Sequence, residues 1–204
     1  MILYFRIHTD MFMDTYFASK KLGPSMRGYT CAQLFVTDFG WCKVKPKKLL
    51  SEIPLVLKSV FKEDGVPEKM ICDVSPEQVS GEAERLCQIA DCTIQQLERG
   101  TPWSNRAEGH VGIVKSEILL DLKESNCPMV LWCYAAERRG KILASTSRNI
   151  YSFGGQVPTA ELTGQQTEIS ALAETGWYEW VYYWDSESRF PYPVERLGRC
   201  LVPC

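Results

Sequence analysis

Alternating apolar and polar residues near the start of the chain predict β-strands. Residues 11–18 and 29–37 are rich in β-branched and aromatic types, and the breaker Gly23-Pro24-Ser25 separates them. Residues 41–45 form a third run of this kind, which we expect to close at Pro46. Together the three segments predict an antiparallel meander.

The pattern then changes to helical spacing interrupted by short strands. Between Leu49 and Phe61, apolar residues recur on one helical face, and a break at 64–67 follows. The later predicted elements are a strand at 69–73, a helix at 75–91, a strand at 92–97, a helix at 101–122 that begins with Thr101 as N-cap and Pro102 at N1, and a helix at about 128–143. This alternation of strands and helices predicts an α/β core.

The composition changes at Asn149, where glycine and proline become frequent. An aromatic block at 177–184 follows, and it predicts a strand in a small β-rich appendage. We therefore expect two parts, a core at 1–148 and a tail at 149–204. Aromatic side chains mostly supply packing area, so we expect this block to fill a core; stacking on nucleotide bases is the alternative.

The overall charge gives no general attraction to nucleic acid, since the net charge is −2 and the pI is near 5.8. Any contact with DNA must therefore come from local basic patches. Two such patches are present: Lys43, Lys45, Lys47 and Lys48, and Arg138, Arg139, Lys141 and Arg148. Each patch taken alone is also compatible with an ordinary solvated face.

The cysteines are typical of a reducing compartment. There are nine, an odd number, spread singly through apolar segments without a Cys-x-x-Cys pair, so we expect buried thiols and no structural zinc site. No apolar run approaches the roughly 20 residues that span a bilayer, and no signal peptide is evident. We expect a soluble, intracellular protein without a membrane partner.

Three acidic residues occupy positions suited to chemistry. Asp14 lies in a predicted strand, Asp73 ends another, and Glu108 lies inside the predicted helix at 101–122. A buried carboxylate needs a partner, and hard cations such as Mg2+ prefer oxygen ligands, so the three predict a divalent-metal site. Asp10 competes for the first position. Lys115 and Asn105 share the helical face of Glu108, and Asn105 is expected to cap the helix or to orient Glu108.

Several of these motifs, in this order, resemble the integrase catalytic core of copia-type retrotransposons, in particular its divergent algal and diatom branch. The matching stretches are Met13-Asp14-Thr15-Tyr16-Phe17-Ala18, the hairpin at 27–40, Ile71-Cys72-Asp73, and Thr101-Pro102-Trp103-Ser104-Asn105-Arg106-Ala107-Glu108. Residues 157–164, 168–170, 177–184 and 196–199 resemble the segment that follows such cores. The flanking residues favour Asp14 over Asp10 as the first acid. The resemblance implies a ribonuclease H-like fold, a five-stranded mixed sheet flanked by helices, followed by the β-rich appendage.

The resemblance also implies a function. It implies Mg2+-dependent polynucleotidyl transfer: DNA 3′-end processing and strand transfer, with two Mg2+ or Mn2+ ions held by Asp14, Asp73 and Glu108. It further implies a homo-oligomer that holds element ends and target DNA, in the nucleus or cytoplasm and in the virus-like particle of a retroelement. Residues expected at DNA are Lys115, Asn105, Lys43, Lys45, Lys47 and Lys48.

Three departures from the family pattern lead to other hypotheses. Asp73-Val74-Ser75 replaces the usual Asp-Asn-Gly, and the helix after Glu108 is poor in basic residues. The zinc-binding module that precedes such cores is not seen, so we expect a fragment or degenerate copy of a longer polyprotein. The alternatives are an inactive DNA-binding or assembly remnant of a decayed element, and a ribonuclease H-like nuclease that cuts RNA in a hybrid.

Overall fold

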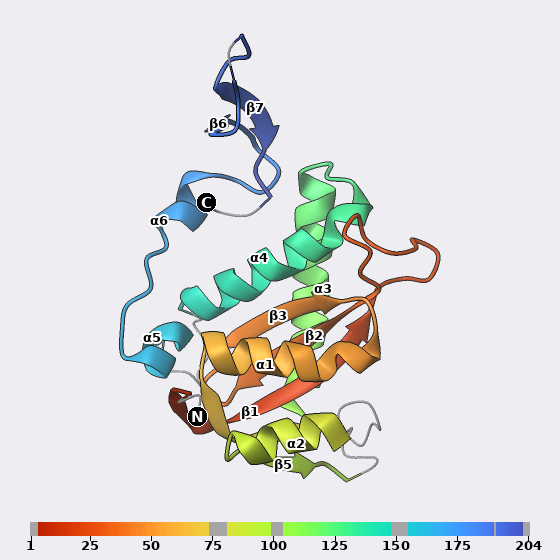
Figure 1. Cartoon of the computed structure of the whole chain (residues 1–204), viewed down its shortest axis with the longest axis vertical. Coiled ribbons are helices and arrows are strands. Elements are labelled where there is room, and N and C mark those ends of the chain that lie inside the picture. The colour runs from red at the N-terminus through yellow and green to blue at the C-terminus, as the bar shows by residue number, and fades with distance from the viewer. Residues whose placement is uncertain (1–3, 74–80, 99–103, 148–154, 190, 202–204) are drawn as a thin grey trace.

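A five-stranded mixed sheet forms the centre of the molecule (Figure 1). The structure, a computed structural model, describes residues 4–73, 81–98, 104–147, 155–189 and 191–201. The strands are β1 Arg6–Phe17, β2 Cys31–Thr37, β3 Cys42–Lys47, β4 Val66–Cys72, β5 Thr93–Gln96, β6 Trp180–Trp184 and β7 Glu195–Arg199. The α-helices are α1 Ile53–Glu63, α2 Gly81–Ile89, α3 Arg106–Glu124, α4 Trp132–Ser145, α5 Pro158–Thr163 and α6 Ser170–Glu174.

The sheet has the strand order β3-β2-β1-β4-β5. Strands β1, β2 and β3 pair antiparallel, which confirms the predicted meander. Strand β1 pairs parallel with β4, and β4 pairs parallel with β5. All seven residues of β2 are buried, because this inner strand has helices on both faces. The predicted mixed five-stranded sheet is confirmed.

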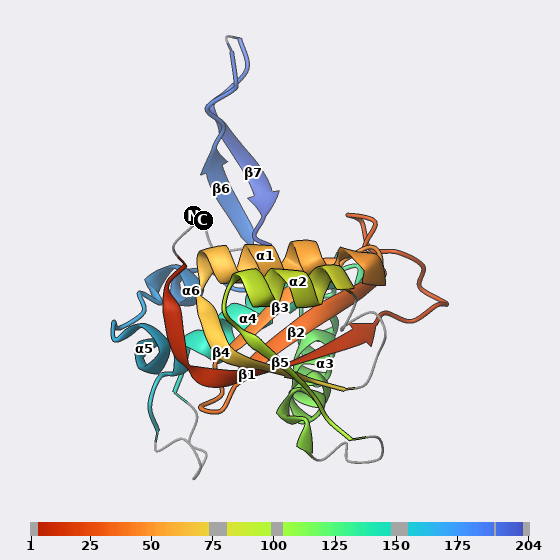
Figure 2. The ribbon, with the colours of Figure 1, turned by 60° about the horizontal axis from the view of Figure 1, so that its bottom comes forward.

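Alternate residues of β1 point into two separate layers. Phe12 and Tyr16 belong to the core cluster that contains residues of α3 and α4, whereas Met11 and Met13 belong to the cluster that contains residues of α1 and α2. Figure 2 shows α1 and α2 together on one face of the sheet. The side chain of Asp14, two residues beyond Phe12, is therefore on the α3 face.

Two predicted strand limits near proline were wrong. Strand β3 continues through Pro46 to Lys47, and Pro46 pairs with Ala32. A proline is tolerated there because β3 is an edge strand and needs no donor on its outer side. Strand β4 begins at Val66 and includes Pro67, so the predicted break at 64–67 is shorter than expected.

The predicted starts of two helices were also wrong. Helix α3 begins at Arg106, after Asn105 as N-cap, whereas Thr101 and Pro102 lie outside the described residues. A 3-10 turn, Met129–Leu131, precedes α4, which starts at Trp132. Helix α4 packs tightly on β3: a Cβ at Gly140 would lie 3.0 Å from the backbone nitrogen of Val44.

The predicted strand in a small β-rich appendage is confirmed, but the role predicted for the aromatic side chains of the tail is not. Strands β6 and β7 form a two-stranded antiparallel hairpin that projects from the sheet domain (Figures 1 and 2). Of the aromatic block, only the side chain of Trp177 is buried, at 8% exposure, whereas Tyr182 is 77% and Trp184 is 68% exposed. The predicted core role of these aromatics was therefore wrong for the hairpin. The division between 1–148 and 149–204 stays a prediction.

The cysteines behave as expected in the described part of the chain. Seven of them are buried free thiols and Cys200 is partly exposed. Within the same residues, no helix combines the length and apolar character needed to cross a membrane.

Candidate active site

Asp14 lies beside the end of β4 because of the strand register. Met13 of β1 pairs with Cys72, the last residue of β4, so Asp14 and Asp73 are the next residues on two neighbouring parallel strands. The Asp14 side chain is partly buried, and its Oδ1 accepts a hydrogen bond of 2.7 Å from the Thr15 backbone nitrogen. The first two predicted acids therefore meet at one place on the sheet.

Asn105 joins this place to α3. Its Nδ2 donates a hydrogen bond of 3.1 Å to Asp73 Oδ1, and its Oδ1 accepts one of 3.0 Å from the Ala107 backbone nitrogen. The amide is 2% exposed, so both contacts are shielded from water. The predicted capping role of Asn105 is confirmed. Its other partner is Asp73, a contact between residues 32 positions apart that the sequence pattern did not indicate.

Glu108 is in the first turn of α3, and not two turns inside a helix as the sequence predicted. This position places its carboxylate near the unpaired N–H groups of the helix start, which favour negative charge. Because the Asn105 amide contacts both Asp73 and the helix start, the turn that carries Glu108 is held next to β4.

The pKa of Asp14 reflects its burial and its charged neighbours. Burial is the largest cause that raises the pKa of Asp14 above its ordinary value, and the Thr15 hydrogen bond opposes it. The negative charges of Asp73 and Glu108 raise this pKa further, while the Lys115 ammonium lowers it. The four side chains are therefore electrostatic neighbours on the α3 face of the sheet.

Carboxylate oxygens are the donors that Mg2+ prefers, and a cation would relieve the repulsion at Asp14. This donor chemistry fits a divalent metal. However, no three His, Cys, Asp or Glu side chains of the described residues are arranged as ligands of one ion. Asp14 thus feels the charge of the other two acids, but the described residues do not form a complete set of ligands for one ion.

Lys115 lies on the same side as Asp14. Its Nζ is 5.5 Å from the centroid of the Tyr16 ring, two residues further along β1. Lys115 also lines an open cavity of about 510 Å3 with apolar side chains that include Tyr16, Leu119 and Trp132. This arrangement leaves a cation beside the carboxylates, above an aromatic ring.

Asp10 and the two histidines have partners outside the three acids. Asp10 Oδ2 is 3.6 Å from Lys69 Nζ, and burial of this pair is partial. His8 Nδ1 lies 3.0 Å from Glu68 Oε1 at an exposed position. His110 Nδ1 lies 3.0 Å from the Arg106 carbonyl oxygen within α3.

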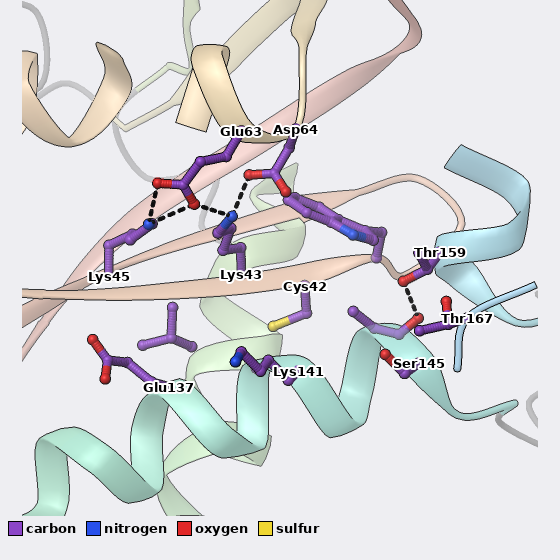
Figure 3. Close-up of a pocket in the computed structure, with 14 residues that line it drawn as sticks. Cys42, Lys43, Lys45, Glu63, Asp64, Glu137, Lys141, Ser145, Thr159 and Thr167 are labelled. Atoms are coloured by element: carbon purple, nitrogen blue, oxygen red, sulfur yellow. Dashed lines mark hydrogen bonds and ion pairs between the residues drawn. The ribbon is translucent and has the colours of Figure 1, made fainter. Parts of the chain in front are cut away.

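Two lysines of the first basic patch, Lys43 and Lys45, form ion pairs with acids at the end of α1 (Figure 3). Lys43 Nζ lies 2.7 Å from Glu63 Oε2 and 2.5 Å from Asp64 Oδ2, and Lys45 Nζ lies 2.8 Å from Glu63 Oε2. These ion pairs border a cavity of about 480 Å3 between β3 and α4. None of the three acids lines this cavity. The sequence analysis did not identify Glu63 and Asp64 as partners of these lysines. The signal was the alternation of lysines along β3, which places several positive charges on one face of the strand, where acidic partners are expected.

The remaining lysines of this patch have opposite surroundings. Lys47 is 1% exposed, and its Nζ donates to Gln33 Oε1 at 2.8 Å and Thr15 Oγ1 at 3.1 Å. Lys48 is exposed. A phosphate contact by Lys47 would require its internal hydrogen bonds to break, whereas Lys48 already faces water. Contact of these lysines with DNA stays a prediction.

Two arginines of the second basic patch are half-buried and paired with an acid, whereas Lys141 is exposed. The Arg139 guanidinium binds the Asp121 carboxylate through two nitrogens, and Nε lies 2.6 Å from Oδ2. Arg138 Nη1 lies 3.8 Å from the same carboxylate. These contacts tie α4 to α3, and Arg148 lies outside the described residues.

Comparison with known proteins finds likeness in structure only. No protein-family model and no curated protein matches the chain. The magnesium-bound HTLV-2 integrase catalytic core in its trimeric form matches with a TM-score of 0.57 and 14% identity, over 78% of this chain and 97% of that one. The catalytic core of BIV integrase matches with a TM-score of 0.54 and 14% identity, over 76% and 93%.

A third match extends into the tail. The simian T-cell lymphotropic virus intasome, solved with the PP2A regulatory subunit B56 gamma, gives a TM-score of 0.63 and 15% identity, over 96% of this chain and 68% of that one. At such identities the matches establish the fold and no more. Together with the sheet order, they show that the chain has the ribonuclease H-like fold of retroviral integrase catalytic cores.

Proposed function

We propose that this chain is an integrase-type polynucleotidyl transferase, with Asp14, Asp73 and Glu108 as its catalytic carboxylates. The observation that carries the proposal is the link through Asn105. Its amide ties Asp73, at the end of β4, to the helix turn that bears Glu108, while the β1–β4 register sets Asp14 beside Asp73. Acids from three separate elements thereby lie near the ends of β1 and β4 in an integrase-like fold.

In this proposal the three carboxylates would hold two Mg2+ or Mn2+ ions. A metal bound there would lower the pKa of the attacking water or hydroxyl group and would neutralise negative charge at the leaving oxygen. The chain's own contribution is positioning. The Thr15 backbone N–H orients the Asp14 carboxylate, and Asn105 orients that of Asp73.

DNA is the proposed substrate, and Lys115 is the proposed phosphate contact nearest the acids. Its ammonium acts on Asp14 and lies above the Tyr16 ring, so a phosphodiester at the carboxylates would lie within its field. Lys48 is the exposed member of the first patch that can add a contact without breaking an ion pair. Contacts of this kind are independent of sequence and weaken with salt.

We also propose a homo-oligomer from a copia-type retroelement. Two similar structures are a trimeric and a dimeric form of one integrase core, and another is an intasome. The assignment to a copia-type retroelement rests on the sequence motifs. The buried free cysteines agree with a reducing, intracellular environment.

The test is Mg2+-dependent nicking and strand transfer on a labelled DNA duplex. We expect activity that is lost in Asp73→Asn and Glu108→Gln, by at least about 100-fold, because these variants remove a carboxylate charge from the site. Asp10→Asn is the matched control, since Asp10 lies on the same strand but pairs with Lys69. Activity that survives both site variants would contradict the assignment, provided circular dichroism shows all three variants folded.

A second candidate function is DNA binding without catalysis. It is favoured by the exposed aromatic side chains of the hairpin, where the Arg199 guanidinium lies 3.8 Å from the centroid of the Trp180 ring. Such a surface can stack bases. This reading predicts DNA binding without cleavage and no thermal stabilisation by Mg2+. Comparing an RNA–DNA hybrid with the DNA duplex separates both readings from a ribonuclease of the same fold.

A further inference from the structure

The end of α2 brings two cysteines together. Cys87 is in the last turn of the helix, and the Cys92 backbone nitrogen donates a hydrogen bond of 2.8 Å to the Cys87 carbonyl oxygen. Asp91, between them, has a left-handed φ of 55°, which turns the chain back on itself. With standard bond lengths, this bond keeps the two Cα atoms within about 6.7 Å, inside the range of roughly 4.4–6.8 Å that disulfides span.

The two side chains also interact. The Cys87 thiol donates a hydrogen bond to the Cys92 sulfur, and this bond raises the pKa of Cys87 and lowers the pKa of Cys92. Burial opposes the lowering, while the Arg6 guanidinium and the Met70 backbone N–H add to it. Arg6 is held in place because its Nη1 donates to the Ala90 carbonyl oxygen at 2.7 Å.

The pair is reached from the surface. Both cysteines line one cavity of about 400 Å3 between α2 and β5, together with polar residues such as Glu84, Gln88 and Thr93. Cys92 is 6% exposed and Cys87 is 1% exposed, so Cys92 is the more accessible sulfur. By contrast, burial raises the pKa of Cys31, Cys72 and Cys127, which makes those thiols poorer nucleophiles.

We propose that Cys87 and Cys92 form a redox modification site, at which a small peroxide oxidises the two thiols to an intramolecular disulfide. The Cys92 thiolate attacks one oxygen of hydrogen peroxide, the O–O bond breaks, and hydroxide leaves, which converts Cys92 to a sulfenic acid. The Cys87 sulfur then attacks the Cys92 sulfur, and the sulfenic oxygen leaves as water. Two thiols and one peroxide thus give one disulfide and two waters.

The disulfide would connect the end of α2 to the start of β5, where the two Cα atoms already lie within the range that disulfides span. The backbone therefore needs no rearrangement, and the fold is expected to persist in the oxidised protein. The site is separate from the three acids and does not depend on the proposed transferase activity.

Peptide mapping tests the proposal directly. Trypsin releases residues 86–99 as one peptide that contains both Cys87 and Cys92, whereas Cys72 falls in the peptide 70–85. The folded protein is treated with hydrogen peroxide, blocked with iodoacetamide and digested. We expect the 86–99 peptide to lose two hydrogen masses and to escape alkylation, and dithiothreitol to restore both thiols.

Other outcomes overturn the proposal. Alkylation of both cysteines after peroxide, conversion of Cys92 to a sulfinic acid in the wild type, or a cross-link to the peptide 70–85 through Cys72 would each exclude the Cys87–Cys92 pair. Cys87→Ser is expected to leave a sulfenic acid on Cys92 that dimedone traps, and Cys92→Ser to abolish trapping. Cys200→Ser is the control and should leave the disulfide unchanged. The wild-type map decides the question even where a serine variant fails to fold.

Discussion

Asp14 shows a conflict between charge and burial at the scale of a single residue. Its carboxylate is partly buried and faces the charges of Asp73 and Glu108, which together raise its pKa above 3.8. A raised pKa means that the ionised form costs folding free energy. This cost is absent below pH 3.8 and appears as the pH rises through the folded-state pKa. At neutral pH without metal, the residue therefore destabilises the fold.

Asp14→Asn is expected to raise the melting temperature of the metal-free protein at pH 7 by roughly 2 °C, a typical effect of relieving about 1 kcal/mol in a chain of this size. The amide oxygen can still accept the Thr15 hydrogen bond. Thermal unfolding followed by circular dichroism measures the change. The gap between variant and wild type should shrink as the pH falls toward 3.8.

Added Mg2+ should stabilise the wild type more than this variant. The wild type should gain stability when Mg2+ is added, because a bound cation compensates the carboxylates. Asp14→Asn should gain less, and Asp10→Asn, whose partner is Lys69, should gain as much as the wild type. A lower melting temperature for Asp14→Asn without metal would show that the charge of Asp14 does not destabilise the fold.

The sequence identified the three acids as candidates, but it did not indicate how they are connected. Residue types in strand ends and a resemblance to integrase cores pointed to Asp14, Asp73 and Glu108. The hydrogen bond from Asn105 to Asp73 joins residues 32 positions apart, and its existence depends on how α3 approaches β4. Periodicity and local motifs contain no information about that approach. For the same reason, the burial of Lys47 could not be distinguished from the exposure of Lys48.

At the scale of elements, Glu63 connects the end of α1 to β3. Burial opposes ionisation, but hydrogen bonds from Lys43, Lys45 and Ser59 outweigh it and lower the pKa of Glu63 from 4.5 to about 2. A lowered pKa stabilises the fold above pH 4.5, and this contribution is lost as the pH falls toward 2. The side chain is 44% exposed, so water screens much of the interaction.

Glu63→Gln is accordingly expected to lower the free energy of unfolding by about 1 kcal/mol at pH 7, a value reduced for this screening. Urea unfolding at pH 7 and again near pH 3 measures it, and the difference should be smaller at the acidic pH. Glu82→Gln, on the exposed side of α2, is the control and should change stability little. An equal loss at both pH values would mean that Glu63 acts through packing and not through charge.

Element order could be predicted better than element limits. Every strand and long helix of the core appears in the expected order, because apolar periodicity follows burial on one or two faces. The limits depend on contacts outside the element. The cap of α3 is Asn105 because Asp73 holds its amide, and β3 runs through Pro46 because its outer edge has no partner strand in the sheet.

At the scale of the whole molecule, the tail combines one buried anchor with an exposed hairpin. Trp177 belongs to the buried cluster that contains Leu122 and Cys127 of the α3 region. The hairpin that follows projects away from the sheet domain, with Tyr182 77% exposed (Figure 2). In the sequence the aromatic block is one continuous segment. Only the three-dimensional structure shows that its first residue is buried in the core and that the residues of the hairpin are exposed.

This division predicts opposite effects for two aromatic substitutions. Trp177→Ala should lower the free energy of unfolding by about 3 kcal/mol, the usual cost of removing a large buried aromatic side chain. Tyr182→Ala should change it by less than about 0.5 kcal/mol, since the ring packs against little. Urea unfolding of both variants measures these values, and fluorescence anisotropy with a labelled DNA strand measures the second consequence. If the hairpin stacks bases, Tyr182→Ala should weaken DNA binding while stability is unchanged. A Tyr182→Ala variant as unstable as Trp177→Ala would instead mean that the hairpin folds back onto the core in solution.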